Sequence, residues 1–477
     1  MSESYRQFLD SKRPKFRKSG FLVYVGQINP QLFPYQRDVV RWALELGKAA
    51  LFQERGLGKT IQEFEWARQV VQHTGGKVLI LAPLAVAFQM VDEAAKFGYD
   101  VKYCQENSQI DDTQIIISNY ERLGNFDTSQ FTGVVLDESS ILKNFSGVVK
   151  RGIINAFKNT PYKLAASATP APNDHLELGN HAEFLDVMPS NEMIARWFIN
   201  DTMKAGDYRL KGHAEKDFWA WITSWAVCLS HPRDLGTEYD VIGFDLPELT
   251  IIEHLVETSQ ETIDYAHSQG LLLPDSRPSL TELNRVKRQS LTLRIDKAIE
   301  IFSAMPQDTP LILWCDTNDE ADLLSDAFPA AIEVRGSHPA KRKEDGLRAF
   351  SRGEVKQIIT KEKIAGRGLN WQHCPRMIFI GVNFSFEGFY QAIGRSHRYG
   401  QTSEVEAHVI YAANEANILQ VLKSKQKAFK EMQSAMNEAM NAHGLFRDGS
   451  RLSLSSSIGN MPIQFPAWLK SHTYSGG

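Results

Sequence analysis

Residues 56–60, with the sequence Gly-Leu-Gly-Lys-Thr, are the part of the chain best suited to bind a phosphate group. They follow a short apolar run and precede a stretch with helical spacing, so a strand, a glycine turn and a helix start are expected in that order. The backbone N–H groups of such a turn and the positive end of the helix attract phosphate oxygens. Lys59 is expected to reach the β- and γ-phosphates of a nucleotide, and Thr60 is expected to ligate Mg²⁺. Gln53 stands where the common form of this loop begins with glycine, so a chance glycine turn stays open as an alternative.

An acidic pair at the end of a second apolar run would complement the phosphate loop. Residues 131–136 are largely apolar and lead directly into Asp137 and Glu138. A carboxylate pair at the tip of a buried strand suits a metal site beside a catalytic base. Asp137 is expected to hold Mg²⁺ through water, and Glu138 to orient and deprotonate an attacking water. An acidic pair alone is also compatible with a surface turn, but the loop and the acids in this order favour a nucleotide-hydrolysing site.

Short apolar runs alternate with amphipathic stretches in two separate blocks. This alternation predicts βαβ units with a parallel sheet in each block, and therefore an α/β fold. The expected strands are 78–82, 115–118, 134–137 and 163–167 in the first block, and 311–315, 332–334, 358–360, 377–381 and 405–411 in the second. Between the blocks, a segment with helical spacing carries Trp197, Trp219, Trp221 and Trp225, which predicts a helical protrusion on the first lobe. These tryptophans could form a packed helical core or could stack on bases.

The composition indicates an ordinary globular protein with two main domains. At 477 residues the chain exceeds what one hydrophobic core usually organises. The formal net charge is −4, so nucleic-acid binding would have to come from a local groove rather than from the charge of the whole chain. No apolar run approaches the roughly 20 residues that a membrane span needs, so no membrane contact is expected. The N-terminus lacks a signal-peptide pattern and the four cysteines are scattered, which favours a reducing cytoplasm.

Six segments match the motifs of a known family. They are residues 34–36 (Pro-Tyr-Gln, upstream of the numbered motifs), 56–62 (first motif, Gly-Leu-Gly-Lys-Thr-Ile-Gln), 137–144 (second motif, Asp-Glu-Ser-Ser-Ile-Leu-Lys-Asn), 167–170 (third motif, Ser-Ala-Thr-Pro), 366–370 (fifth motif, Gly-Arg-Gly-Leu-Asn) and 391–401 (sixth motif, Gln-Ala-Ile-Gly-Arg-Ser-His-Arg-Tyr-Gly-Gln). On these motifs the chain resembles the superfamily-two helicases, and within them the Swi/Snf-type DNA translocases. Its compact form is similar to that of small helicases of bacteriophages and other mobile elements. Ser140 stands where the second motif usually has histidine, which puts the usual coupling contact of that motif in doubt.

The resemblance implies two tandem RecA-like lobes that bind ATP and Mg²⁺, with the third motif coupling the ATP site to a nucleic-acid groove. Gln36 would read the adenine, since an amide can both donate and accept. The arginines of the sixth motif would contact the γ-phosphate, with Arg398 as the first choice and Arg395 beside it. The predicted catalytic residues are Lys59, Asp137, Glu138, Arg395 and Arg398. The predicted nucleotide-binding residues are Gln36, Gly56, Gly58, Lys59, Thr60, Gly368 and Gln391, and the predicted metal ligands are Thr60 and Asp137.

The expected organisation has six parts. These are an N-terminal arm (1–29), the first lobe (30–180), the helical protrusion (181–249), a connection (250–290), the second lobe (291–445) and a tail (446–477). In the second lobe, Phe429, Met432, Met436 and Met440 recur at helical spacing, which predicts a docking seam. The function expected is an ATP-dependent, monomeric translocase or helicase acting on nucleic acid, with duplex DNA favoured. The alternatives are an RNA or single-strand helicase, and a nucleic-acid-binding scaffold with a regulatory nucleotide site.

Overall fold

The computed structural model describes residues 18–143, 147–200, 208–239, 242–256, 288–365, 369–381, 383, 385–412 and 415–443. The described residues from 18 to 239 form one compact unit together with residues 429–443, and those between 242 and 428 form the second unit. This division into two units does not resolve the six parts expected from the sequence, whose boundaries stay predictions. Within the described residues, none of the helices combines the length and the apolar character that a membrane crossing requires.

The described part of the first unit contains a seven-stranded sheet in the order β3-β4-β2-β5-β6-β1-β9, with every neighbouring pair parallel. Its strands are β1 (Lys48–Gln53), β2 (Lys77–Ala82), β3 (Lys102–Tyr103), β4 (Ile115–Asn119), β5 (Phe131–Asp137), β6 (Tyr162–Ser167) and β9 (Ala226–Leu229). The four strands expected in this block are confirmed. Parallel strands that are covered on both faces read as nearly continuous apolar runs, which is why the sequence showed them.

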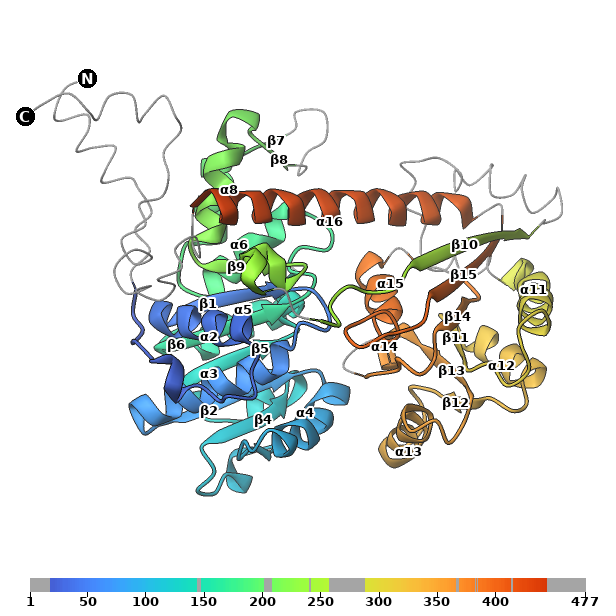
Figure 1. The fold of residues 1–477 in the computed structure, drawn as a ribbon, viewed down its shortest axis with the longest axis horizontal. Helices are drawn as coiled ribbons and strands as arrows, with labels where there is room; N and C mark the ends of the chain where they lie inside the picture. The colour runs from blue at the N-terminus through green and yellow to red at the C-terminus, as the bar shows by residue number, and fades with distance from the viewer. Residues whose placement is uncertain are drawn as a thin grey trace, which may run out of the picture. The chain divides into compact units, whose positions relative to one another are not determined.

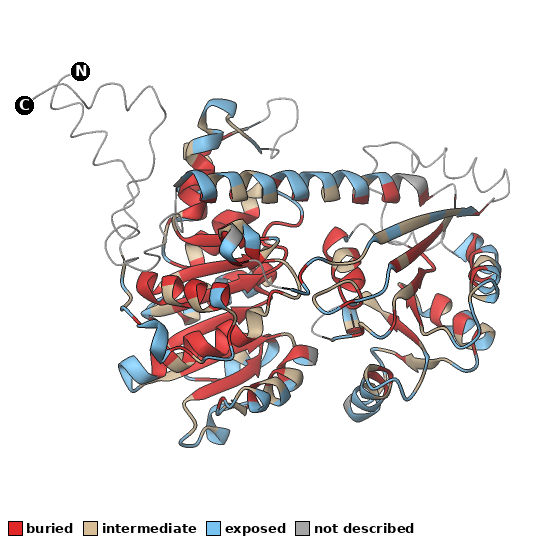
Figure 2. Ribbon diagram, in the orientation of Figure 1, coloured by how far each residue is buried: buried red, intermediate tan, exposed pale blue. Residues whose placement is uncertain are grey.

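Helices connect these strands and cover the sheet (Figure 1). They are α2 (Pro34–Leu46), α3 (Lys59–Thr74), α4 (Leu84–Lys96), α5 (Val148–Ala156), α6 (Leu178–Phe184), α7 (Ser190–Trp197) and α8 (Glu215–Thr223). Helix α3 starts directly after the glycine turn that follows β1, and it packs against α2 and β5. The strands are mostly buried, except for the half-buried edge strand β3, whereas the helices keep exposed faces (Figure 2).

The segment predicted to be a helical protrusion is only partly helical. It contains α7 and α8, but also the antiparallel pair β7 (Phe198–Asn200) and β8 (Tyr208–Leu210), and it ends in β9, which extends the main sheet beside β1. The run Ala226–Leu229 is fully buried and too short for its spacing to distinguish a strand from a helix, so the sequence did not show it. The tryptophans Trp197, Trp221 and Trp225 are at most 1% exposed, which makes them core residues rather than a stacking platform.

The second unit contains a six-stranded parallel sheet among its described residues, in the order β10-β15-β14-β11-β13-β12. The strands are β10 (Leu249–Val256), β11 (Leu311–Cys315), β12 (Ile332–Val334), β13 (Gln357–Lys361), β14 (Arg376–Phe379) and β15 (Val405–Ala412). The helices are α11 (Leu291–Ser303), α12 (Asn318–Ala327), α13 (Ala340–Ser351), α14 (Glu362–Ala365), α15 (Phe386–Ile393) and α16 (Ala416–His443). The five strands expected here are confirmed. Strand β10 was predicted to be part of a connection, and it is the partly exposed edge strand of this sheet (Figure 2).

Helix α16 carries the predicted methionine stripe. Phe429, Met432, Met436 and Met440 are all at most 3% exposed, as a docking seam requires. This part of the helix belongs to the first unit, where Asn437 Nδ2 donates to Asp234 Oδ2 over 3.2 Å. The predicted tail from 446 lies outside the described residues, as does the N-terminal arm up to residue 17.

Candidate nucleotide site

The phosphate loop lies between the end of β1 at Gln53 and the start of α3 at Lys59. Two of its glycines have left-handed backbone angles, with φ of 83° at Gly56 and 68° at Gly58. A Cβ at position 58 would lie only 2.3 Å from Gln36 Nε2, so a side chain there would have to displace its neighbour as well as strain the backbone. The turn therefore needs glycine, and it leads directly into the N-terminus of α3, the end of a helix that attracts anions.

Gln53, which breaks the common loop pattern, has a structural partner. Its side-chain amide forms a reciprocal pair with that of Gln62, with N···O distances of 2.9 and 2.8 Å, and both residues are fully buried. Gln62 Nε2 also lies 3.1 Å from the carbonyl oxygens of Leu57 and of Gly58. The pair thus ties the end of β1 to α3 across the loop, and phosphate binding by this turn stays a prediction.

Lys59 points back into the loop that carries it. Its Nζ donates to the carbonyl oxygen of Gln53 at 2.9 Å and lies 3.4 Å from that of Glu54. Burial lowers the pKa of Lys59, while Glu138 and Asp137 oppose that shift. The ammonium is therefore already held beside the two predicted catalytic acids.

The acidic pair lies at the carboxyl end of β5, which pairs with β6 in the sheet. Tyr120 Oη donates to the Asp137 carbonyl over 2.7 Å. Glu138 has a φ of 53°, a left-handed conformation that is uncommon for a residue other than glycine and is often found at functional sites. Ser167 Oγ of the third motif lies 3.5 Å from Glu138 Oε2, and Thr169 N donates to Ser167 Oγ over 3.1 Å. The side-chain contact between Glu138, the predicted catalytic base, and Ser167 thus connects the second motif to the third.

The electrostatics of this site favour the arrival of a cation. Burial raises the pKa of Asp137, and the nearby Glu138 raises it further, whereas Lys59 opposes the shift. Among the described residues, no group of three His, Cys, Asp or Glu side chains could hold a metal ion by itself. A Mg²⁺ ion here would therefore need phosphate oxygens and water in addition to Thr60 and Asp137, which is how Mg²⁺ is usually bound with nucleotides.

Gln36, the predicted adenine reader, is nearly buried and contacts the phosphate loop. Its Nε2 lies 3.1 Å from the Leu57 carbonyl oxygen and 3.3 Å from Tyr35 Oη, and its Oε1 accepts from Phe33 N at 2.9 Å. Its amide thus supports the loop directly. Adenine recognition by this residue stays a prediction.

The arginines of the sixth motif converge on one carbonyl oxygen of the second unit. Arg395 Nη1 and Arg398 Nη1 lie 2.8 and 3.2 Å from Leu369 O, and Arg395 Nε donates to the carbonyl of Gln391. Arg395 is 4% exposed, whereas Arg398 is only half-buried, so Arg398 is the more accessible of the two. Gly368 lies outside the described residues.

A buried histidine that the motif comparison did not identify contacts the second motif. His181 Nε2 of α6 lies 3.1 Å from Ser139 Oγ, and its ring meets Phe52 of β1 edge-on at 5.1 Å. Burial lowers the pKa of His181 to about 4. Ser140 stands where the second motif usually has histidine. The imidazole of His181, on α6, is instead hydrogen-bonded to Ser139, the residue before Ser140. The only signal in the sequence is a histidine shortly after the third motif.

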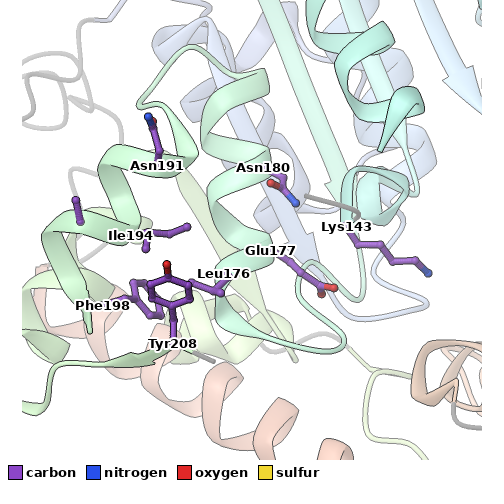
Figure 3. A pocket seen from close by; sticks show the side chains of 9 residues that line it. Lys143, Leu176, Glu177, Asn180, Asn191, Ile194, Phe198 and Tyr208 are labelled. Atoms are coloured by element: carbon purple, nitrogen blue, oxygen red, sulfur yellow. The ribbon is translucent and has the colours of Figure 1, made fainter. Parts of the chain in front are cut away.

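A cavity of about 620 Å³ opens beside the second motif in the first unit (Figure 3). Its lining combines apolar and polar side chains from several elements: Lys143, Leu176, Glu177, Asn180, Asn191, Ile194, Ala195, Phe198 and Tyr208. Asn180 Nδ2 donates to the Leu142 carbonyl over 2.8 Å, so the wall of the cavity touches the second motif. The lining includes neither the phosphate loop nor the acidic pair, which makes the cavity separate from the nucleotide site.

Comparison with known proteins identifies two domains in the chain. Residues 35–211 match the SNF2-related domain, and residues 294–400 match the helicase conserved C-terminal domain. The chain is 22% identical over 479 residues to the uncharacterized ATP-dependent helicase YqhH of Bacillus subtilis, covering 90% of this chain and 84% of that protein. It is 21% identical to the chromatin remodeling factor mit1 of Schizosaccharomyces pombe, over 94% of this chain but 36% of that protein.

A solved structure, the Sulfolobus solfataricus SWI2/SNF2 ATPase core in complex with dsDNA, aligns over 88% of this chain and 97% of that chain with 21% identity and a TM-score of 0.40. The SNF2-related match contains the predicted phosphate loop and the acidic pair, and the helicase C-terminal match contains Arg395 and Arg398. The chain therefore belongs to the Swi/Snf-type superfamily-two helicases and is an ATP-hydrolysing enzyme.

Proposed function

We propose that this ATPase is a translocase that moves along duplex DNA and uses ATP hydrolysis to displace or remodel what is bound there. The observation that carries the proposal is the contact between Ser167 and Glu138. It connects the predicted catalytic base to the third motif, which the family resemblance assigns to coupling between the ATP site and a nucleic-acid groove. The name of the chromatin remodeling factor mit1 supports a role on DNA. We further propose that the protein works as a monomer in the cytoplasm; the similarity to phage helicases stays a prediction.

The proposed hydrolysis uses residues whose positions are described above. Lys59 withdraws negative charge from the β- and γ-phosphates, while the N-terminus of α3 holds the phosphate oxygens. Glu138 takes a proton from the attacking water as the new P–O bond forms and the bond to ADP breaks. Mg²⁺, held by Thr60 and Asp137, would supply positive charge to the phosphates. We propose Arg398 as the residue that contacts the γ-phosphate during turnover, since its guanidinium stays charged and fits phosphate oxygens.

The direct test is steady-state ATPase activity without nucleic acid and then with duplex DNA, single-stranded DNA and RNA. The Glu138→Gln variant is the blank, because it keeps the shape of the site and removes the base. Strong stimulation by duplex DNA would support the proposal. Stimulation only by RNA or by single strands would replace it with a single-strand helicase, and binding of ATP without turnover would favour a scaffold.

A further inference from the structure

Glu63 is a buried acid that the motifs do not account for. It lies on α3 four residues after Lys59, and therefore on the same face of that helix one turn further along. Its side chain is 0% exposed and is hydrogen-bonded to the Asp137 side chain, but among the described residues no N–H or hydroxyl group donates to either of its oxygens. Two buried carboxyl groups in contact cannot both carry an uncompensated charge, so this pair needs either a shared proton or a nearby cation.

The surroundings of Glu63 are themselves acidic. Its electrostatic neighbours are Asp137, Lys59 and Glu138. Burial and the nearby Asp137 raise the pKa of Glu63, and Lys59 is the neighbour that opposes this shift. Since Lys59 is already bonded to loop carbonyl oxygens, one ammonium faces three carboxyl groups. Such a site attracts further positive charge.

Glu65, two residues later, shows how a structural acid on the same helix is satisfied. It is also 0% exposed, but it pairs with Arg68 at 2.6 Å and accepts from Tyr99 Oη at 2.9 Å. Glu63 has no equivalent of these partners within the described residues. The difference argues against a purely structural role for Glu63, since the same helix satisfies its neighbour fully.

A hydrated divalent cation supplies what Glu63 needs. Mg²⁺ gives up its water reluctantly and usually keeps several water ligands, each of which is a hydrogen-bond donor. The described residues do not form a three-residue metal site, so direct chelation by Glu63 together with Asp137 and Glu138 does not fit. Contact through metal-bound water does fit, because it leaves the direct ligand positions to the nucleotide and to Asp137.

We propose that Glu63 is a binding residue for the water shell of the divalent cation that accompanies ATP, and that it increases the preference of the site for metal-bound over metal-free nucleotide. The inference rests on the proposed assignment of the ATP and Mg²⁺ site. Glu63 would be a third acid at this site, beside Asp137 and Glu138 of the second motif. The first motif ends at Gln62, so it does not specify the residue at position 63.

The test compares Glu63→Gln with Glu65→Gln in the full chain. Mn²⁺ affinity is measured by electron paramagnetic resonance in the presence of a non-hydrolysable ATP analogue. Fluorescent ATP binding is measured in EDTA and again in Mg²⁺. Loss of an outer-shell partner typically weakens metal affinity roughly 10–100-fold. For Glu63→Gln we expect a loss of this size for Mn²⁺, with no weakening of metal-free ATP binding, because a negative charge near the phosphates has been removed.

The control and the contrary results separate this role from a structural one. Glu65→Gln should leave both affinities unchanged and lower the thermal unfolding temperature of the metal-free protein, whereas Glu63→Gln should not lower it. Unchanged Mn²⁺ affinity in Glu63→Gln, or an equal loss with and without metal, would overturn the inference. Lys59→Ala reports on the underlying assignment: if it binds ATP as the wild type does, the site itself is wrong, whatever Glu63 does.

Discussion

The buried imidazole of His181 should make the first unit sensitive to mild acid. The pKa of His181 falls from its ordinary 6.5 to about 4 because the ring is fully buried. As the pH drops, the unfolded chain takes up the proton before the folded chain does, so the folded state loses stability between about pH 6.5 and pH 4. The full effect is about 3 kcal/mol, of which about 2 kcal/mol falls between pH 7 and pH 5.

The His181→Gln variant tests this because glutamine does not titrate but keeps a polar group near Ser139. Urea unfolding of both proteins at pH 7 and pH 5, followed by the fluorescence of the buried tryptophans of the first unit, gives the four free energies of unfolding that are needed. The wild type should lose about 2 kcal/mol more than the variant on going to pH 5. If both proteins lose the same amount within about 0.5 kcal/mol, the neutral buried imidazole is not the cause, since errors of that size are usual.

The other predictions concern nucleotide binding and turnover. Lys59→Ala should abolish binding of a fluorescent ATP analogue and ATPase activity; normal activity would show that residues 56–60 are not the phosphate loop. Arg398→Ala should lower kcat by about 10³-fold or more while ATP affinity changes little, and an unaffected rate would make Arg395 the candidate. Gln36→Ala should relax the preference for ATP over GTP in competition assays; it should also weaken binding of both, because Leu57 O loses a donor. Ser167→Ala should uncouple DNA stimulation from basal hydrolysis, and full stimulation in this variant would remove the third-motif link.

The sequence predicted the strands that are uniformly apolar and missed those that are not. Strands β2 and β5 are buried along most of their length, so their composition identifies them. Strand β10 alternates half-buried and exposed residues and includes Glu253 and His254, which gives no apolar run to detect. Strand β9 is buried, but it follows directly on the tryptophan-rich helical pattern and was read as part of it.

The motifs predicted the site residues but not the contacts among them. Lys59, Asp137 and Glu138 could be found because their spacing follows a known order. The Gln53–Gln62 pair and the bond from His181 to Ser139 could not, since they join residues that only the folded chain brings together. Gln53 even counted as a defect of the loop, although it is one of its supports. Glu63 could not be identified from the sequence, because acidic residues are common on helices and only the structure shows that this one is buried.

The first unit is assembled from two separated parts of the chain, and this has a consequence for synthesis. Its core includes Phe429, Met432, Met436 and Met440 from α16, which leave the ribosome only after the whole second unit has been made. Until then, these four residues cannot contribute to the core of the first unit, and Asp234 lacks its contact from Asn437. The ATP-binding unit, although its first part precedes the second unit in the chain, is therefore completed only after the second unit has been synthesised.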